Sequence, residues 1–494
     1  MPLEYMGSVK QETLNGVKWG MIQKFTMQPV QFLFGILLAR LITPAEMGIV
    51  GLTAIFFAVA AQLKDAGFGA ALIQKQDRTE EDCSTVFWYN VGVSALLALA
   101  LFMAAPWFAD FYHEPALTDV SRVSAIMLLL NSTAGVHWAL YSARRDFKTP
   151  AIVGMVSTLV AMPVTIWAAY VGWSYWALVL QGVVSGALSL IIIWIVSPWK
   201  PRFIFSLASF RRFFSYGSKL LASGMIWTVY SESRTFLIGK FYSTAQLAFY
   251  TRAHHLCYMP VHYATSMIGG VIFPVLSAIQ DDEERLLGVY SKYIRLIGLL
   301  TIWPMLLLVT NADNVIYCLY GENWLPAAFY AKIICLGALL DPLAYVAVQM
   351  FLVKGRTDLS LRREIWLRSF ALVTMIIGAC HSVAGVCYAL VAACVFNAFI
   401  SSYYVSKCSG ISMKRQAVDL WRYLLPAAMA VIPCYVINSI VPNAYLALLC
   451  SSVFSAALFM GMMYIKRDPM AVEVYGTFMN SKIGKFIFRK SQSC

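Results

Sequence analysis

The sequence predicts an all-α polytopic membrane protein with about 14 transmembrane helices. The chain of 494 residues is 60% hydrophobic and 13% charged, and its mean hydropathy is +0.68, a more apolar composition than soluble domains have. Apolar windows of about 20 residues, the length that crosses a bilayer core of about 30 Å, recur along most of the chain. Stretches such as "LSLIIIWIVS" are apolar on every face, whereas membrane-spanning β-strands alternate in polarity.

The apolar windows follow one another with short polar turns between them. We expect helices centred near residues 28, 56, 96, 129, 160, 185, 228, 262, 300, 341, 374, 394, 431 and 455. The N-terminal segment is too polar for the core of a signal peptide, so the first helix is expected to direct its own insertion. The longest pieces outside the membrane, near residues 198–216 and after residue 466, are shorter than the roughly 50 residues of a small catalytic domain.

The net charge of +13 is better explained by membrane topology than by nucleic-acid binding. The turns "FADFYHEPALTD" and "NADNVIYCLYGENWLP" contain no Lys or Arg, whereas "SARRDFK", "WKPRF" and "KGRTDLSLRRE" are rich in them. The positive-inside rule therefore predicts that both termini are cytoplasmic. The 11 Cys include no CxxC pair, which argues against a disulfide framework or a metal site.

The stretch "LLARLITPAEMGIV" at residues 37–50 predicts a tight outer turn between two helices. Thr43 and Glu46 have the spacing of a capping box, and Pro44 occupies the first helical position. Arg40 lies just before the turn, at the outer end of the preceding helix.

The same pattern recurs 200 residues later in "FLIGKFYSTAQLAF", where Lys240 corresponds to Arg40 and a second capping box joins Ser243 to Gln246. "NGVKWG" likewise resembles "YGSKLL", and "ADFYHEP" resembles "IYCLYGEN". Four matches in the same order predict two parallel six-helix lobes and favour a transporter. The expected division is an N-lobe over residues 1–215, a C-lobe over residues 216–410, and two accessory helices with a cytoplasmic tail over residues 411–494.

Several longer stretches resemble the polysaccharide exporters, or oligosaccharide flippases, of the MOP superfamily. Among them are "LLARLITPAEMGIVGLTAIFFAVAAQLKDAGFGAALIQK", "STVFWYNVGVS", "FSLASFRRFFSYGSKLLAS", "VIFPVLSAIQDDEERL" and "LYGENW". The resemblance implies a MOP flippase-type fold in the bacterial inner membrane. It also implies that an undecaprenyl-diphosphate-linked oligosaccharide is moved from the cytoplasmic to the periplasmic leaflet during lipopolysaccharide or exopolysaccharide biosynthesis. The implied partners are membrane lipids and the polymerase and glycosyltransferases of the same pathway.

A carrier of a lipid diphosphate must solvate an anion inside the membrane, because unsolvated charge there is very costly. Two helices carry polar stripes at helical spacing that suit this task. We expect the stripes to line a cationic cavity between the lobes, although a lysine that reaches the interface explains Lys24 almost as well. The substrate-binding candidates are Lys24, Gln28 and Gln31 on the first helix and Lys219, Trp227, Tyr230 and Arg234 on the seventh, where Ser223 lies on the same stripe.

Two intramembrane carboxylates are candidates for ion coupling. Glu232 lies roughly 200° around its helix from Arg234, so the two residues are not partners by spacing. Glu232 and Asp341 are each suited to bind the proton or sodium ion that drives transport, and structural pairing explains them equally well.

The remaining polar residues of the spans have structural explanations. Pore lining or interhelical hydrogen bonding is expected for His255, Tyr258, His262, Arg122, His137 and Lys332, since the histidine spacing does not match a helical zinc site. Capping and interface anchoring are expected for Arg40 and Lys240. The sequence has no P-loop, no Rossmann fingerprint and no exposed acid pair, so we expect neither an enzyme nor a cofactor or metal.

Two other functions stay open. A drug or cation antiporter of the same superfamily is disfavoured by the cationic stripes, because like charges repel in a low-dielectric site. A membrane-embedded glycan polymerase needs an outward catalytic surface, and the outer turns here are short and free of Lys and Arg. Neither the glycan nor the coupling ion can be read from the residues.

Overall fold

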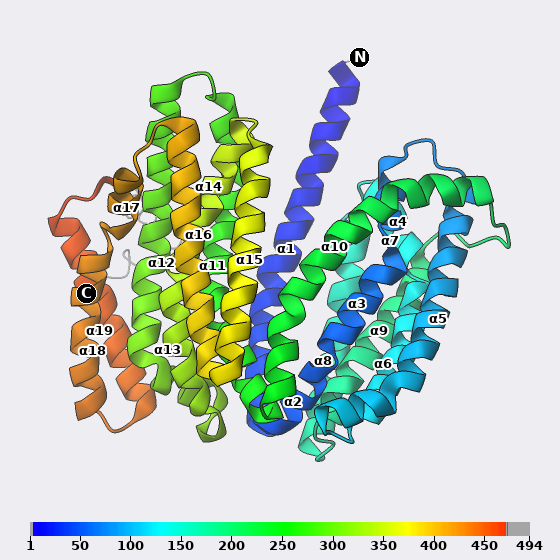
Figure 1. Cartoon of the computed structure of the whole chain (residues 1–494), viewed down its shortest axis with the longest axis horizontal. Coiled ribbons are helices and arrows are strands. Elements are labelled where there is room, and N and C mark those ends of the chain that lie inside the picture. The colour runs from blue at the N-terminus through cyan, green and yellow to red at the C-terminus, as the bar shows by residue number, and fades with distance from the viewer. Residues whose placement is uncertain (1–2, 471, 473–494) are drawn as a thin grey trace, which may run out of the picture. The chain divides into compact units, whose positions relative to one another are not determined.

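The computed structural model describes residues 3–470 and residue 472, and every regular element in this range is helical (Figure 1). Internal contacts divide the chain into an N-terminal unit, Met1–Ala248, and a C-terminal unit, Phe249–Cys494. Most of the cytoplasmic tail expected after residue 466 lies outside the described residues.

The N-terminal unit combines helix pairs that are adjacent in sequence, such as α5–α6 and α8–α9, with pairs that are distant in sequence, such as α3–α10 and α1–α8. Its helices are α1 (Leu3–Leu41), α2 (Pro44–Leu52), α3 (Ala54–Asp65), α4 (Phe68–Gln74), α5 (Glu80–Tyr112), α6 (Leu117–Ser132), α7 (Gly135–Ala143), α8 (Lys148–Tyr170), α9 (Trp176–Val196) and α10 (Leu207–Phe241). The next helix, α11 (Thr244–Ala278), begins in this unit and continues into the C-terminal unit.

The C-terminal unit is organised around its longest complete helix, α12, which packs against α13, α14, α18 and α19. Figure 1 shows α18 and α19 as an orange and red hairpin beside α12. The helices are α12 (Glu283–Tyr320), the short 3-10 helix η1 (Glu322–Trp324), α13 (Pro326–Ala338), α14 (Asp341–Val353), α15 (Thr357–His381), α16 (Val383–Ser409), α17 (Met413–Trp421), α18 (Leu424–Ile440) and α19 (Ala444–Ile465).

The predicted class, a polytopic helical membrane protein, is confirmed. Ten helices or continuous helix combinations among the described residues are long and apolar enough to cross a membrane, and α6 with α7, bent by 41°, forms an eleventh if taken together. All the predicted helix centres fall within helices. The count of 14 spans stays a prediction, because α1, α10 and α11 are long enough but more polar than those ten.

Both predicted capping boxes form. Thr43 N donates to Glu46 Oε2 at 2.8 Å, and Glu46 N donates to Thr43 Oγ1 at 3.4 Å. In the second hairpin, Ser243 N donates to Gln246 Oε1 at 3.4 Å and Gln246 N donates to Ser243 Oγ at 3.3 Å. Each box satisfies two amide groups that a helix start would otherwise leave without partners.

The two hairpins also touch each other within the N-terminal unit. A Cβ atom placed on Gly48 would overlap the carbonyl oxygen of Thr244, the first residue of α11. Glu46 has a further role, because its side chain also accepts a hydrogen bond from Ser174 in the turn between α8 and α9. The sequence repeat is thus also a packing contact, which depends on glycine at position 48.

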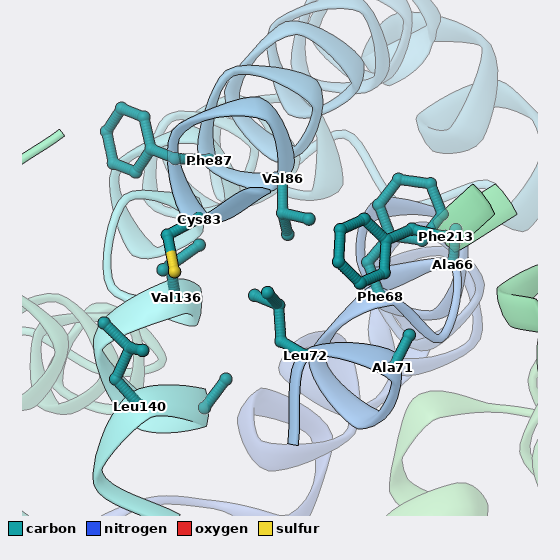
Figure 2. Close-up of a cluster of buried hydrophobic side chains, with 11 residues drawn as sticks. Ala66, Phe68, Ala71, Leu72, Cys83, Val86, Phe87, Val136, Leu140 and Phe213 are labelled. Carbon is teal, nitrogen blue, oxygen red and sulfur yellow. The ribbon is translucent and has the colours of Figure 1, made fainter. Parts of the chain in front are cut away.

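Near its start, α10 also makes a close backbone contact with other helices of the N-terminal unit. A Cβ atom on Gly217 would overlap the carbonyl oxygen of Ala66, at the left-handed break between α3 and α4. Figure 2 shows Phe68 and Phe213 beside Ala66 in one buried cluster, to which α5 contributes Val86. Since α10 packs on α3, α4 and α5, it belongs to the N-terminal unit by contacts, and the lobes over residues 1–215 and 216–410 stay a prediction.

The accessory helices are fastened to α12 by side-chain hydrogen bonds. Asn311 is buried, and its Oδ1 accepts from Ser451 Oγ of α19 at 2.7 Å and from Asn438 Nδ2 of α18 at 3.2 Å. Trp303 Nε1 donates to Ser455 Oγ at 3.0 Å. Polar side chains that bond across helices commonly hold membrane helices together, since lipid tails compete as well as leucine does for apolar contact.

The close approach at Gly217 predicts a stability loss that other glycines will not show. Gly217→Ala is expected to destabilise the folded protein by about 1–3 kcal/mol, because the added methyl must displace the Ala66 carbonyl. Gly92→Ala in α5 is the matched control, since nothing lies within 4 Å of its would-be Cβ. Thermal melting of the detergent-solubilised proteins measures the difference, and equal melting temperatures for the two variants would contradict the close contact.

Candidate functional site

The polar stripe of α1 lies beside the face that packs in the N-terminal unit. Met27 and Phe34 are buried, whereas Lys24 and Gln31 are exposed and Gln28 is half-buried. Within the described part of the chain, Lys24 has no hydrogen-bond or ion-pair partner, and the buried Oε1 atom of Gln28 accepts no hydrogen bond. A lysine and an amide thus share one accessible strip of α1.

The stripe of α10 is accessible along its whole length. Lys219 and Trp227 are exposed, and Tyr230 and Arg234 are half-buried. The stripe lies roughly a third of a turn around the helix from the face that carries Gly217. At about 1.5 Å per residue, it runs for roughly 22 Å along the helix axis.

A further cation, Lys64 of α3, was not singled out from the sequence. Lys64 lies in the last turn of α3, half-buried, with no hydrogen-bond or ion-pair partner among the described residues. The side chain of Gln62 lies against α10, because a Cβ atom on Gly224 would meet its Oε1 at 2.7 Å. By sequence Lys64 resembles a loop charge, since the apolar window ends before it, but α3 and α4 continue the helical segment to Gln74.

Glu232 is the acidic residue of α10 that was a candidate for ion coupling. It is half-buried on α10, and no hydrogen bond or ion pair joins it to another residue that the structure describes. The interhelical partner that its sequence position suggests is therefore not seen in this range.

Asp341 sits at a break in a span of the C-terminal unit. The segment Pro326–Val353 is interrupted between α13 and α14, and Asp341 is the first residue of α14. Tyr258 of α11 donates its hydroxyl to Asp341 Oδ2 at 2.8 Å and lies 3.6 Å from Cys394 Sγ of α16. One tyrosine hydroxyl therefore connects three helices at this break.

The ring of Tyr258 is sandwiched by histidines, though not by both of those that the sequence suggests. His254 stacks on it with a centroid separation of 4.4 Å, and His262 lies at 6.2 Å. His255 is exposed instead. A spacing of four residues on each side of Tyr258 brings these rings together, which identifies His254 as a member of the cluster.

Arg363 is a second residue that sequence reasoning missed. The side chain is buried, and its Nε donates to Ser401 Oγ at 2.8 Å while Nη2 donates to Asn397 Oδ1 at 2.7 Å. Glu364 lies 3.4 Å from its Nη1. These contacts tie α15 to α16 and use the donors of the guanidinium, so Arg363 acts as a structural cation.

The other polar residues singled out from the sequence have local contacts. Lys240 Nζ donates to the Phe111 carbonyl oxygen at 2.7 Å, so it caps the end of α5. Buried His137 meets Ser197 Oγ through Nδ1 at 2.8 Å. The remaining contacts are Lys332 with Asp313, Arg122 with Asp119 at 4.0 Å, and Arg40 exposed at the end of α1.

The two units differ in the chemical groups that they present. The N-terminal unit presents Lys24, Lys64 and Lys219, which lack ion-pair partners in the described range, together with exposed Trp227. Such groups suit an anion attached to a sugar, because ammonium groups bind phosphate and aromatic faces pack on sugar rings. The C-terminal unit instead holds Asp341 in a hydrogen-bonded cluster.

The chain was compared with known proteins. A family model described as polysaccharide biosynthesis protein matches residues 37–329, more than half of the chain. The lipopolysaccharide biosynthesis protein WzxC of Escherichia coli is 22% identical over 494 residues, which cover 98% of this chain and 99% of WzxC. The teichuronic acid biosynthesis protein TuaB of Bacillus subtilis is 26% identical over 358 residues, covering 72% of this chain and 74% of TuaB.

Among solved structures, the lipid II flippase MurJ in an inward closed conformation resembles this chain with a TM-score of 0.74. The match covers 92% of this chain and 100% of MurJ at 12% identity. Likeness at this level of identity shows the fold, and it confirms the predicted flippase-type fold. The chain is therefore a multi-pass membrane protein that belongs to the polysaccharide biosynthesis protein family.

Proposed function

We propose that this protein is a flippase for an undecaprenyl-diphosphate-linked oligosaccharide. In this proposal it moves the lipid-linked glycan from the cytoplasmic to the periplasmic leaflet of the bacterial inner membrane, for surface polysaccharide or exopolysaccharide biosynthesis. Family membership and the names of WzxC and MurJ support the substrate class. The polymerase and glycosyltransferases of the same pathway are its proposed partners, and transport rather than catalysis is its proposed activity.

The observation that carries the proposal is a set of accessible lysines on α1, α3 and α10 that have no ion-pair partner among the described residues. Lys24 is exposed on α1, Lys219 is exposed on α10, and Lys64 is half-buried on α3. A charged face of this kind is not stable against lipid, so we assign it to the water-filled cationic cavity expected from the sequence. A diphosphate that enters such a site replaces the water around the ammonium groups with charge-assisted hydrogen bonds.

The aromatic residues of the α10 stripe suit the glycan that follows the diphosphate. Trp227 and Tyr230 lie between Lys219 and Arg234 in the sequence of the helix. Sugar rings pack on aromatic faces by apolar contact, while the tyrosine hydroxyl offers a hydrogen bond. This alternation fits a substrate in which an anionic group and neutral sugars are joined, and we propose alternating access as the mechanism.

One prediction concerns a cation from each of the two polar stripes. Lys24→Ala and Arg234→Ala are each expected to abolish surface polysaccharide while the protein still inserts into the membrane, because an unsolvated diphosphate cannot cross. Staining of surface polysaccharide, with immunoblotting of membrane fractions, measures both properties. Lys466→Ala, which removes an exposed charge just after α19, is the control. Normal surface polysaccharide in both test variants would refute the cationic path.

The second prediction concerns Lys64, which hydropathy alone would place in a loop. Lys64→Ala is expected to slow flipping of a lipid-linked oligosaccharide in proteoliposomes by about tenfold, the loss typical of one hydrogen bond to a charged group. Lys64→Arg keeps the charge and is expected to retain most of the activity. Equal rates for the wild type and Lys64→Ala would show that this cation only anchors the end of α3.

The third prediction tests Asp341 as an ion-coupling residue. Asp341→Asn is expected to abolish the acceleration of transport by a proton or sodium gradient, while exchange of substrate without a gradient continues. Tyr258→Phe removes only the hydroxyl that bonds Asp341 and keeps the ring stacked on His254, so it serves as the matched variant. Gradient-driven transport at the wild-type level in Asp341→Asn would assign Asp341 to structural pairing alone.

A further inference from the structure

The segment that leads from α9 into α10, residues 198–214, is fixed to α5 rather than loosely tethered. Trp88 Nε1 donates to the Arg202 carbonyl oxygen at 2.8 Å, and Arg202 N donates to Ser84 Oγ at 3.1 Å. Ser206 N donates to Thr85 Oγ1 at 3.0 Å. Because Ser84 and Thr85 are buried in the first turns of α5, these bonds hold the backbone of the segment in one place.

A buried carboxylate provides the second attachment. Asp82 Oδ1 accepts from Ser209 Oγ and from Arg212 Nη2, each at 2.8 Å, so the start of α10 is tied to α5. Its Oδ2 accepts from Thr79 N at 3.0 Å and forms an ion pair with Lys75. Asp82 has no exposed surface, and all its acceptor capacity is directed to these partners.

The same segment leaves large apolar side chains uncovered. Phe203 is 92% exposed, Phe205 54% and Leu207 55%, and Ile204 and Phe214 are exposed as well. Phe203 stacks on Trp88 with a centroid separation of 4.9 Å, so its position is set. A fixed group of exposed apolar side chains is typical of a surface that binds a partner or a membrane.

The segment that carries these apolar residues also carries cationic residues and no acidic ones. Residues 198–214 contain Lys200, Arg202, Arg211 and Arg212 and neither Asp nor Glu. Arg212 is paired with Asp82, and Arg202 lies 2.7 Å from Glu80, a pair in which both side chains are more than half exposed. Arg211 is exposed and has no hydrogen-bond or ion-pair partner within the described residues.

The apolar group continues the exposed surface of a membrane span. Ile191, Ile195 and Val196, near the end of α9, are exposed and precede the segment directly. A surface that begins on a spanning helix and then combines aromatic and aliphatic side chains with arginines has the composition of an interfacial membrane-binding element. The Lys and Arg distribution of the chain predicts that this end of α9 is cytoplasmic, where the leaflet surface is negative.

We propose that residues 198–214 form an interfacial element that binds anionic phospholipids of the cytoplasmic leaflet. Phe203, Phe205 and Leu207 insert at the boundary between headgroups and acyl chains, and Arg202 and Arg211 bind lipid phosphates. The element is held by α5 through Asp82, so the lipid surface fixes the position of the N-terminal unit at this edge. This function concerns bulk phospholipid and does not depend on the identity of the transported substrate.

The test uses the full-length protein without any lipid-linked oligosaccharide. Native mass spectrometry of the purified protein counts bound phosphatidylglycerol and phosphatidylcholine at equal concentrations. The wild type is expected to prefer phosphatidylglycerol, and each of Arg202→Gln and Arg211→Gln is expected to lower that preference by about fivefold. The double variant Arg285→Gln/Arg362→Gln removes two exposed arginines of the C-terminal unit and is expected to keep the preference.

Hydrogen exchange in nanodiscs locates the effect. Peptides over residues 198–214 are expected to exchange more slowly in phosphatidylglycerol than in phosphatidylcholine nanodiscs, and Phe203→Ser/Phe205→Ser is expected to remove that protection. The absence of a phosphatidylglycerol preference in the wild type would overturn the proposal. An equal loss of the phosphatidylglycerol preference in the Arg285→Gln/Arg362→Gln control would also overturn it. The same holds if protection of residues 198–214 from hydrogen exchange requires an added protein rather than lipid.

Discussion

Unpaired charge is so costly in hydrocarbon that each ionised side chain of a span needs a partner or water. Arg363 meets this requirement through Ser401, Asn397 and Glu364, and it is buried as a result. Lys24 and Lys64 have no such partners among the described residues, and both keep accessible surface. The two groups therefore separate structural cations from those that depend on water or a ligand. Under the proposed function, Lys24 and Lys64 are therefore better candidates for binding an anion than Arg363 is.

Close backbone packing and neutral hydrogen bonds hold the described helices together, in addition to the ion pair between Asp82 and Arg212 that ties α10 to α5. At Gly48 and Gly217 the backbones approach so closely that a methyl group would overlap a carbonyl oxygen. Asn311 fastens the accessory helices through neutral hydrogen bonds. Small residues and neutral polar groups are usual at membrane helix interfaces. Lys24 of α1 and Lys219 of α10 have no ion-pair partner among the described residues, so under the proposed function they are available to a substrate.

Local features were predictable from the sequence, and tertiary features were not. The capping boxes at Thr43 and Ser243 follow from residue types at fixed spacing, and both form as predicted. Lys64 was missed because the apolar window of the sequence ends before it. In the structure, α3 is followed after a left-handed break by α4, and the helical segment extends to Gln74. Asp82 bonds Arg212, 130 positions away, and Arg363 bonds Asn397, 34 positions away, and no local pattern encodes these contacts. The polar stripes of α1 and α10 could be predicted from residue spacing. Their accessibility could not, because it depends on which face of each helix packs against other helices.

The spacing of the cations bears on how a diphosphate would move past them. Lys219 and Arg234 are separated by roughly 22 Å along α10, which far exceeds the size of one diphosphate group. The anion therefore meets these two residues in turn rather than together. Tight binding at a single site would slow release, whereas several weaker sites allow entry and exit, as in other permeation paths. A ladder of separated cations with aromatic residues between them thus favours stepwise passage over a single high-affinity pocket.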